Sequence, residues 1–394
     1  MGILDAPALS ISDAKKSYAA LALNTYIPIG DSITADPLPY NGPSWARLID
    51  VITGQALRTI RNAGVPGNTS TQALARIQTD VIAYRPRWCS ILIGTNDISQ
   101  SVPFDTWKAN VVAMVNACLN AGIKVILCTL PARTDAGGFA QTTGVWNDWI
   151  RLYAQSRPGV YLVDFHKATA NQPGGLWNTG YAMPDNVHPG PLGAQAMAEA
   201  AKTAMLAFLP PAPSILPTHG AAWTQVGPNL LRNPLMVGGP DGWAYSPTTA
   251  PAGSTRSVVT DARFVGSASK FSMVNPAAVD GFMSNTAIAA GATTFQPGET
   301  LRALARVVIT SDTLVSTGNK GLSIKLVCTG AATPDQFVIK NVPNAIDGVV
   351  QGEIVVPAGT TSIKYAVTAD WSTTGSADVL IGQLGLYNAT TLGL

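Results

Sequence analysis

The chain has 394 residues, which is long for one domain and sufficient for two, each with its own hydrophobic core. Charged residues make up only 12% of the chain and the formal net charge is +2, so the composition gives no reason to expect a nucleic acid or an anionic membrane as partner. No segment approaches the roughly 18 uninterrupted apolar residues of a membrane span. The first residues also lack the basic and apolar regions of a secretory signal peptide, so we expect a soluble protein.

The first half of the chain alternates apolar runs with helical patterns. After an N-terminal arm, residues 1–24, apolar runs predict strands at residues 25–30, 57–62, 89–93, 124–129 and 160–165. Apolar residues at helical spacing predict helices over residues 44–54, 74–82, 107–122, 146–155 and 191–208. This alternation favours a parallel sheet covered on both faces, which is a three-layer α/β domain over residues 25–209. Ligands of such sheets bind at the edge where the strands end.

The chain changes character at residues 210–228, where prolines prevent both helix and paired strand. We interpret this stretch as a semi-rigid linker. Beyond it, residues 229–394 show short alternating or β-branched runs separated by Gly, Pro, Asn and Asp, which predicts an all-β sandwich. The runs are residues 257–260, 301–309, 322–327, 336–339, 349–356, 362–367 and 379–387.

Four loops of the first domain carry residues that suit acyl transfer. Ser32 follows the first strand, and Asp185 precedes His188 by three residues, a spacing that lets one turn bring carboxylate and imidazole together. His188 could then accept the proton of Ser32 while Asp185 orients the ring. An attacked carbonyl develops negative charge on its oxygen, which fixed donors must meet. The candidate donors are the backbone N–H groups of Ser32 and Gly64 and the side-chain amide of Asn96.

Each residue near these loops also has a structural interpretation. A serine after a glycine is more often a helix N-cap than a nucleophile, so the hypothesis depends on all four loops together. Asp31 and Asp97 are better interpreted as hydrogen-bond acceptors that fix their loops, and Gly67 as a turn glycine. His166 could approach the site but is more simply a surface or capped histidine, and His219 is assigned no role.

Cysteine and histidine spacing gives no metal pattern. The four cysteines lie inside apolar runs without C-x-x-C spacing, which indicates buried free thiols. The three histidines form no H-E-x-x-H or other close ligand pair, so a catalytic zinc site is not expected.

The four loop segments, residues 30–34, 62–67, 94–97 and 185–189, resemble the ordered sequence blocks of the SGNH/GDSL hydrolase family. The resemblance covers about residues 25–208 and implies a flavodoxin-like sheet with the strand order 2-1-3-4-5. It also implies a serine esterase that needs no cofactor. In that family the matching residues imply Ser32 as nucleophile, His188 as base and Asp185 as the acid that orients the base. Ser32, Gly64 and Asn96 would supply the donors of the oxyanion hole.

The second domain carries a resemblance of its own. Residues 229–235, followed by Gly242-Trp243, resemble the opening strand of jelly-roll carbohydrate-binding modules. Such a module implies contact with a polysaccharide. Trp243, Tyr245 and Trp371 would stack on sugar rings if they are exposed and would be core aromatics if they are buried.

These resemblances together imply an esterase that removes O-acetyl groups from a polysaccharide. The chain is also similar to phage tail-associated esterases, which implies a virion tail component or a homo-oligomer that acts outside the cell; the other expectation is a cytoplasmic enzyme. One alternative is a lipase or thioesterase for acyl chains, although residues 36–43 and 134–144 are not apolar enough for a lid. Another is a non-catalytic, glycan-binding tail protein.

Overall fold

The chain divides into two compact units, one of residues 21–212 and one that combines residues 213–394 with residues 1–20. A computed structural model describes residues 24–39, 42–54, 56–134, 138–172, 174–209, 216, 229–237, 239, 242–246, 253–274, 281–311, 321–342, 345–370 and 375–392. The predicted arm (1–24) and linker (210–228) fall outside these residues except for Asn24 and Leu216. Their boundaries therefore stay predictions.

The first unit, which we call the hydrolase domain after the family that its sequence resembles, contains a parallel sheet. Its strand order is β2-β1-β4-β5-β6, and β3 also pairs with β1. This order confirms the predicted 2-1-3-4-5 arrangement. The second predicted strand is divided into two dipeptides, β2 and β3, which pair with opposite ends of β1. The strands are β1 (Thr25–Gly30), β2 (Arg58–Thr59), β3 (Ala63–Gly64), β4 (Trp88–Leu92), β5 (Lys124–Cys128) and β6 (Val160–Val163).

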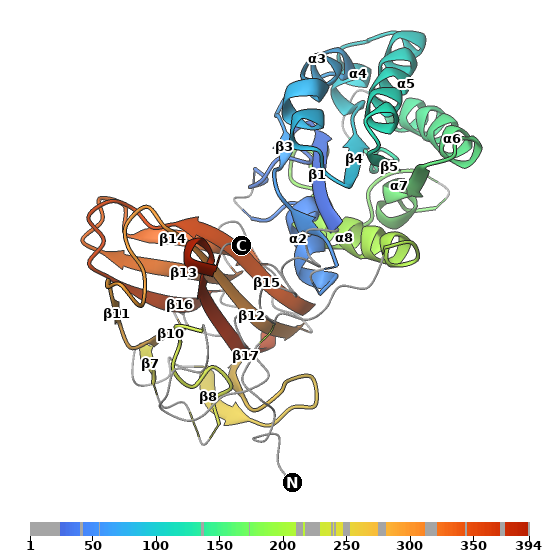
Figure 1. Cartoon of the computed structure of the whole chain (residues 1–394). Coiled ribbons are helices and arrows are strands. Elements are labelled where there is room, and N and C mark those ends of the chain that lie inside the picture. The colour runs from blue at the N-terminus through green and yellow to red at the C-terminus, as the bar shows by residue number, and fades with distance from the viewer. Residues whose placement is uncertain are drawn as a thin grey trace. The chain divides into compact units, whose positions relative to one another are not determined.

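Helices cover both faces of this sheet (Figure 1). On one face α2 (Trp45–Ile52) packs against α8 (Pro191–Leu206), and on the other face lie α3 (Ser70–Asp80), α5 (Phe104–Asn120) and α6 (Ala140–Ser156). The stacked rings of Trp107 and Trp146, 4.2 Å apart, join α5 to α6. A 3₁₀ turn, η3 (Ile82–Tyr84), follows α3.

Two short helices of the hydrolase domain were not predicted. They are α4 (Thr95–Ser99) and α7 (Phe165–Thr169), and each begins within three residues of a strand end. Five residues are too few to show an apolar period, so no sequence pattern marks them.

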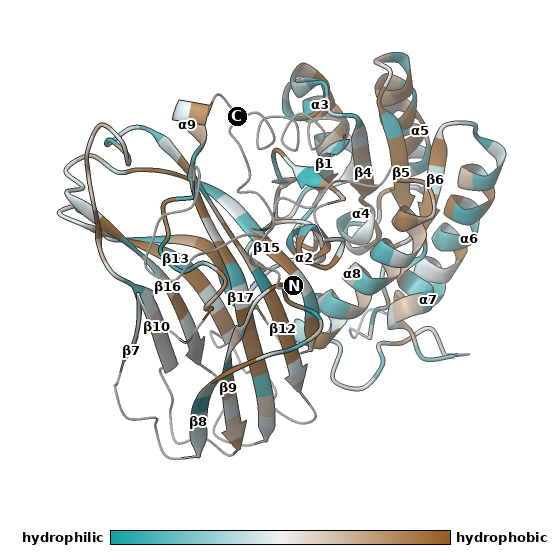
Figure 2. Ribbon diagram, turned by 60° about the horizontal axis from the view of Figure 1, so that its bottom comes forward, coloured by the Kyte–Doolittle hydropathy of each residue, from teal (hydrophilic) through white to brown (hydrophobic). Residues whose placement is uncertain are grey.

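The interior of the hydrolase domain is apolar, as Figure 2 shows by the brown segments of its strands and the mixed colours of α5 and α6. Its three cysteines, Cys89, Cys118 and Cys128, are buried free thiols. Cys328 is a buried free thiol of the second unit. The prediction of buried free thiols is therefore confirmed.

The second unit, which we call the β-domain, consists of two antiparallel sheets. Their orders are β14-β13-β16-β10-β7, with β11 beside β16, and β15-β12-β17-β9-β8. The Tyr365 hydroxyl on β16 donates a hydrogen bond to the Leu304 carbonyl on β12 (3.0 Å), so the sheets pack face to face. The predicted all-β class is confirmed, and a jelly roll is consistent with it. The strands, with the short helix α9 (Ala389–Leu392), are β7 (Trp243–Ser246), β8 (Ser254–Val259), β9 (Ala268–Val274), β10 (Gly281–Asn285), β11 (Ile288–Ala289), β12 (Thr300–Ser311), β13 (Gly321–Thr329), β14 (Asp335–Val342), β15 (Ile346–Val355), β16 (Ser362–Asp370) and β17 (Ser376–Asn388).

The aromatic residues considered for sugar stacking differ in how far they are buried. Trp243 is only 7% exposed, donates its indole N–H to the Asn233 carbonyl (3.3 Å) and contacts Tyr365 edge to face. Tyr245 is partly buried, and its hydroxyl is 2.7 Å from the Ser269 hydroxyl. Trp371 lies outside the described residues. Trp243 is therefore a core aromatic, as the structural interpretation expected.

Candidate active site

The turn after β1 places Ser32 at the carboxyl edge of the parallel sheet. The Asp31 carbonyl accepts hydrogen bonds from the Thr34 and Ala35 N–H groups, and Asp31 Oδ1 accepts one from the Ile33 N–H (2.9 Å). Gly30 leads into this turn, where a Cβ atom would overlap the Leu92 carbonyl and the Thr34 side chain. The tight turn therefore requires glycine before Asp31 and leaves the Ser32 side chain partly exposed.

Three predicted residues meet at this edge. His188 Nε2 is 2.7 Å from Ser32 Oγ, and His188 Nδ1 is 2.6 Å from Asp185 Oδ2. Asp185 Oδ1 also accepts the backbone N–H groups of Val187 and His188, at 2.9 and 3.0 Å. Burial acts to raise the pKa of Asp185, but these hydrogen bonds outweigh it and hold the pKa below its usual value. The carboxylate is therefore ionised and fixed beside the imidazole.

Hydrogen bonds from Trp177 and Thr134 fix the turn that carries Asp185 and His188. At its centre Asn186 has a left-handed conformation (φ +57°), and its carbonyl accepts the indole N–H of Trp177 (3.1 Å) and the N–H of Thr134 (3.2 Å). The Trp177 N–H in turn donates to the Thr134 hydroxyl (3.0 Å). Trp177 is 6% exposed, so a buried ring fixes a turn whose own residues are largely exposed.

One of the predicted oxyanion donors, the Gly64 N–H, already has an acceptor within the protein. The Gly64 N–H donates to Asn62 Oδ1 (2.8 Å), so an oxyanion would have to share or displace this bond. Glycine at this position has another explanation, because a Cβ atom would overlap the backbone of Ala35. The Asn62 side chain also donates to the Thr34 carbonyl (2.8 Å). Gly64 thus belongs to the packing of the second loop against the turn that carries Ser32.

Asn96, the remaining candidate donor, lies among the loops at the carboxyl edge of the sheet. It lies in α4 at the end of β4, and one hydrogen of its amide donates to the Asn68 carbonyl (3.0 Å), which leaves the other for a ligand. The buried guanidinium of Arg133 holds α4 from below through the Thr95 carbonyl (3.0 Å) and the Ser99 hydroxyl (3.1 Å). The amide is therefore fixed on both sides.

Two acidic residues of these loops are structural, as predicted, but they differ in their electrostatics. Asp97 is buried and accepts hydrogen bonds from the backbone N–H and the hydroxyl of Ser70, which ties the third loop to the start of α3. Asp31 is 1% exposed, and its Oδ2 atom has no hydrogen-bond partner. Burial raises the pKa of Asp31 to about 6, against the opposing effects of the Ile33 N–H and His188. A destabilised carboxylate thus sits next to Ser32.

Sequence reasoning missed several residues that hold the loops together. Arg76 of α3 donates to the Gly30 carbonyl (2.8 Å) and the Ala63 carbonyl (2.7 Å), so it joins the first and second loops. Asn62, Arg133 and Trp177 act in the same way on their own loops. A lone arginine on a helix or a lone tryptophan in a loop carries no motif, so only the structure identifies them.

His166 lies away from the triad's hydrogen bonds. It is 8% exposed in α7, its Nε2 has no partner, and burial lowers its pKa, with Arg151 adding to the effect. Of the two structural interpretations of His166, the surface residue is therefore wrong, and the capped histidine stays a prediction for a residue in the last turn of α7. His219 falls outside the described residues. Within the described part of the chain, no group of three or more His, Cys, Asp or Glu side chains could hold a metal ion, and no helix is long and apolar enough to cross a membrane.

Comparison with known proteins gives the class of this domain. Residues 29–196 match the model of the GDSL-like Lipase/Acylhydrolase family, and the four loops of the site lie inside this range. The hydrolase domain is therefore similar to GDSL-like lipases and acylhydrolases over 168 of the 394 residues of the chain.

Individual relatives match shorter segments. Thioesterase 1/protease 1/lysophospholipase L1 of Escherichia coli is 31% identical over 81 residues, which are 21% of this chain and 38% of that protein. The lipoprotein YqeF of Bacillus subtilis is 36% identical over 76 residues, 18% of this chain and 31% of that one. The chain thus spans well under half the length of these curated relatives.

Solved structures resemble about half of the chain. A GDSL-like lipase from Bacteroides thetaiotaomicron aligns with 50% of this chain and 99% of its own, at 22% identity and a TM-score of 0.40. An acetylxylan esterase from Geobacillus stearothermophilus aligns with 45% of this chain and 91% of its own, at 24% identity and a TM-score of 0.38.

Proposed function

We propose that the hydrolase domain cleaves carboxylic esters with Ser32 as nucleophile, His188 as general base and Asp185 as the orienting acid. The observation that carries the proposal is the unbroken chain of contacts from Ser32 Oγ to His188 Nε2 (2.7 Å) and from His188 Nδ1 to Asp185 Oδ2 (2.6 Å). This order of groups lets the imidazole accept a proton at one nitrogen while the carboxylate stabilises the positive charge at the other.

The reaction would proceed in two acyl-transfer steps. Ser32 Oγ attacks the ester carbonyl as His188 accepts its proton, and the tetrahedral intermediate releases the alcohol when His188 returns that proton to the leaving oxygen. A water molecule, activated in the same way, then hydrolyses the acyl-serine. The oxyanion of each intermediate would be met by the Ser32 N–H and the second amide hydrogen of Asn96. Gly64 enters this hole only if substrate displaces Asn62 from its N–H.

For the substrate we propose short acyl esters on a polysaccharide, with O-acetyl groups first. Two features support this choice. The β-domain is built from two antiparallel sheets, the architecture of jelly-roll modules that the sequence of residues 229–243 resembles. The segments that flank the site, residues 36–43 and 134–144, do not form the long apolar run that a lid for acyl chains requires.

An acyl-length series tests the proposal directly. The full chain should hydrolyse p-nitrophenyl acetate with a higher kcat/KM than the butyrate and octanoate esters. A preference for octanoate would favour the lipase or thioesterase alternative. No turnover of any ester would favour the non-catalytic alternative, a glycan-binding protein.

The contribution of the β-domain is tested on polymer. Residues 21–212, expressed alone, should keep turnover of p-nitrophenyl acetate but lose turnover of acetylated polysaccharide, because a tethered binding module raises the local concentration of polymer. Equal loss on both substrates would mean that the β-domain supports the fold of the hydrolase domain instead. Location on a virion tail remains part of the same hypothesis and is tested by labelling purified particles with an antibody against the chain.

A further inference from the structure

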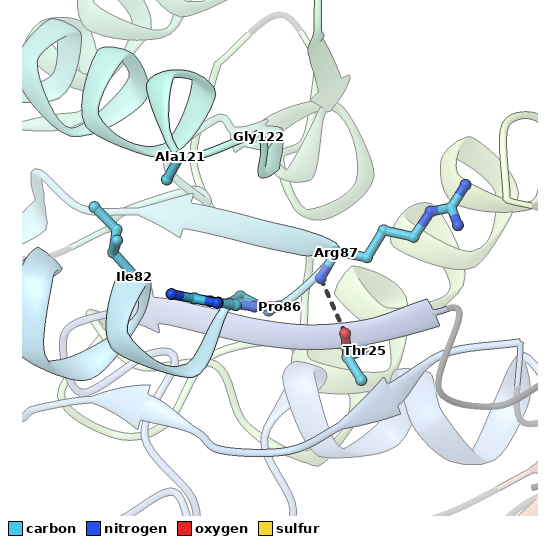
Figure 3. A pocket seen from close by; sticks show the side chains of 7 residues that line it. Thr25, Ile82, Pro86, Arg87, Ala121 and Gly122 are labelled. Carbon is cyan, nitrogen blue, oxygen red and sulfur yellow. Dashed lines mark hydrogen bonds between the residues drawn. The ribbon is translucent and has the colours of Figure 1, made fainter. Parts of the chain in front are cut away.

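A pocket lies at the edge of the parallel sheet opposite to Ser32. Its volume is about 670 Å³, and it lies between η3, the start of β1 and the end of α5. Figure 3 shows the Arg87 N–H donating to the hydroxyl of Thr25, the first residue of β1, whereas Ser32 follows the last residue of the same strand. The length of β1 therefore separates the pocket from the triad. Its volume is within the range of about 300–1,000 Å³ that is typical of small-molecule sites. It is lined by Thr25, Ile82, Arg85, Pro86, Arg87, Ala121 and Gly122.

The charged groups of this pocket are all cationic. The two charged residues of its lining, Arg85 and Arg87, are exposed, and none of the ion pairs between described residues includes either one. The nearest acidic residue in the sequence, Asp80, already pairs with Arg61 and Arg76. Two guanidinium groups without a carboxylate partner favour an anionic ligand, because a guanidinium donates paired hydrogen bonds to carboxylate or sulfate oxygens.

The backbone and the lining add two more features. Arg85 is the C-cap of η3 and has a left-handed conformation (φ +49°), so the chain turns at this residue before it enters β4. Ile82, Pro86 and Ala121 form the apolar part of the pocket, and in Figure 3 the Arg87 side chain extends away from Ile82 and Ala121. A ligand that fits this arrangement has an apolar face and a negatively charged substituent. A pyranose ring with a carboxylate or sulfate group has both.

We infer that this pocket binds acidic sugar units, so that the polysaccharide substrate of the hydrolase domain is an anionic polymer. The statement that this polymer is the substrate rests on the proposed function. Binding of acidic sugars at the pocket does not depend on the triad. A polymer held at the amino edge of the sheet would have its chain anchored at a distance from the ester that Ser32 attacks. Binding at this pocket would then affect turnover of polymer and leave small esters unaffected.

Binding measurements on charge-matched variants test the inference. The full chain should bind polygalacturonate or dextran sulfate and not neutral dextran in isothermal titration calorimetry, with an affinity that falls as salt is raised. Arg85→Gln/Arg87→Gln should weaken binding by about 10- to 100-fold, the loss expected when charge-assisted hydrogen bonds are removed. The control, Lys108→Gln/Lys202→Gln, removes the same charge from partly exposed positions on α5 and α8 and should change affinity less than threefold.

A comparison of the two anionic polymers identifies the charged group that the pocket binds. Binding of polygalacturonate alone points to carboxylate, and binding of dextran sulfate alone points to sulfate. Equal losses in the two double variants would overturn the inference, because net charge and not the pocket would then set affinity, and so would the absence of binding to both anionic polymers. Turnover of p-nitrophenyl acetate, measured in parallel and expected to be unchanged in both variants, reports on the proposed function separately.

Discussion

The two edges of the parallel sheet differ in how their polar and charged side chains are bonded. At the carboxyl edge, buried polar groups such as Asp97 and Arg133 hold four loops in place by hydrogen bonds between them. At the amino edge, Arg85 and Arg87 are exposed and have no carboxylate partner among the described residues. The first edge is organised for precise placement of reacting atoms, and the second has the charge but not the hydrogen-bond network of a catalytic site.

Ser32→Ala gives the largest effect that this comparison predicts. Loss of the nucleophile should lower kcat for p-nitrophenyl acetate by about 10⁴-fold or more, since the remaining groups keep only the catalysis due to the oxyanion hole and binding. The melting temperature should stay within about 2 °C of the wild type because the hydroxyl is partly exposed. Ser156→Ala, on the surface of α6, is the control. Retained turnover in Ser32→Ala would place the reaction elsewhere.

Asn96→Ala should have the next largest effect. Removal of one oxyanion donor typically lowers kcat by about 100- to 1,000-fold. Initial rates over a range of ester concentrations should show this loss in kcat with little change in KM. Asn116→Ala removes an amide from α5, where it accepts a hydrogen bond from Arg157, and should leave both constants unchanged. A change confined to KM would remove Asn96 from the proposed oxyanion hole.

Trp177→Phe tests whether the buried ring positions the triad. The phenyl ring keeps most of the packing but cannot donate to the Asn186 carbonyl, and one such hydrogen bond contributes about 0.5–1.5 kcal/mol. We expect kcat to fall by about 2- to 13-fold, the same free energy expressed as a rate. KM for p-nitrophenyl acetate should be unchanged. Trp149→Phe on α6 is the matched control, and equal effects of the two substitutions would contradict a positioning role.

Asp31→Asn should have its clearest effect on stability. The folded-state pKa of about 6 lies above the ordinary value of 3.8, so the folded state binds the proton more tightly than the unfolded state. The destabilising charge is absent below pH 4, develops as pH rises to 6 and is complete above it. At pH 8 its cost is about 3 kcal/mol at most.

Thermal unfolding at two pH values measures this cost. Asp31→Asn should raise the melting temperature relative to the wild type more at pH 8 than at pH 4. Asp105→Asn, whose side chain is 92% exposed, should show no such difference between the two pH values. The same shift for Asp31→Asn at both pH values would mean that packing and not charge sets its effect.

Local patterns predicted most of the fold and the triad. Asp185 and His188 lie within one turn, so their contact follows from spacing alone. The apolar runs predict the parallel sheet, whereas its strand order was implied only by the resemblance to the SGNH/GDSL family. The acceptor of the Gly64 N–H could not be predicted in this way, because it depends on how Asn62 is placed in space. The same is true of Arg76 and of the strands β7, β9, β10 and β11, whose residues show little alternation.

Because each unit contains at least one buried cysteine, the local unfolding of each unit can be measured separately. Three of them lie in the hydrolase domain and Cys328 lies in the β-domain, all buried and unpaired. A thiol reagent reacts with such a group only while the surrounding structure is open, so the labelling rate measures the free energy of that opening. Mass spectrometry of the labelled peptides would thus follow the unfolding of the two units in one sample, without the introduction of a cysteine by mutation.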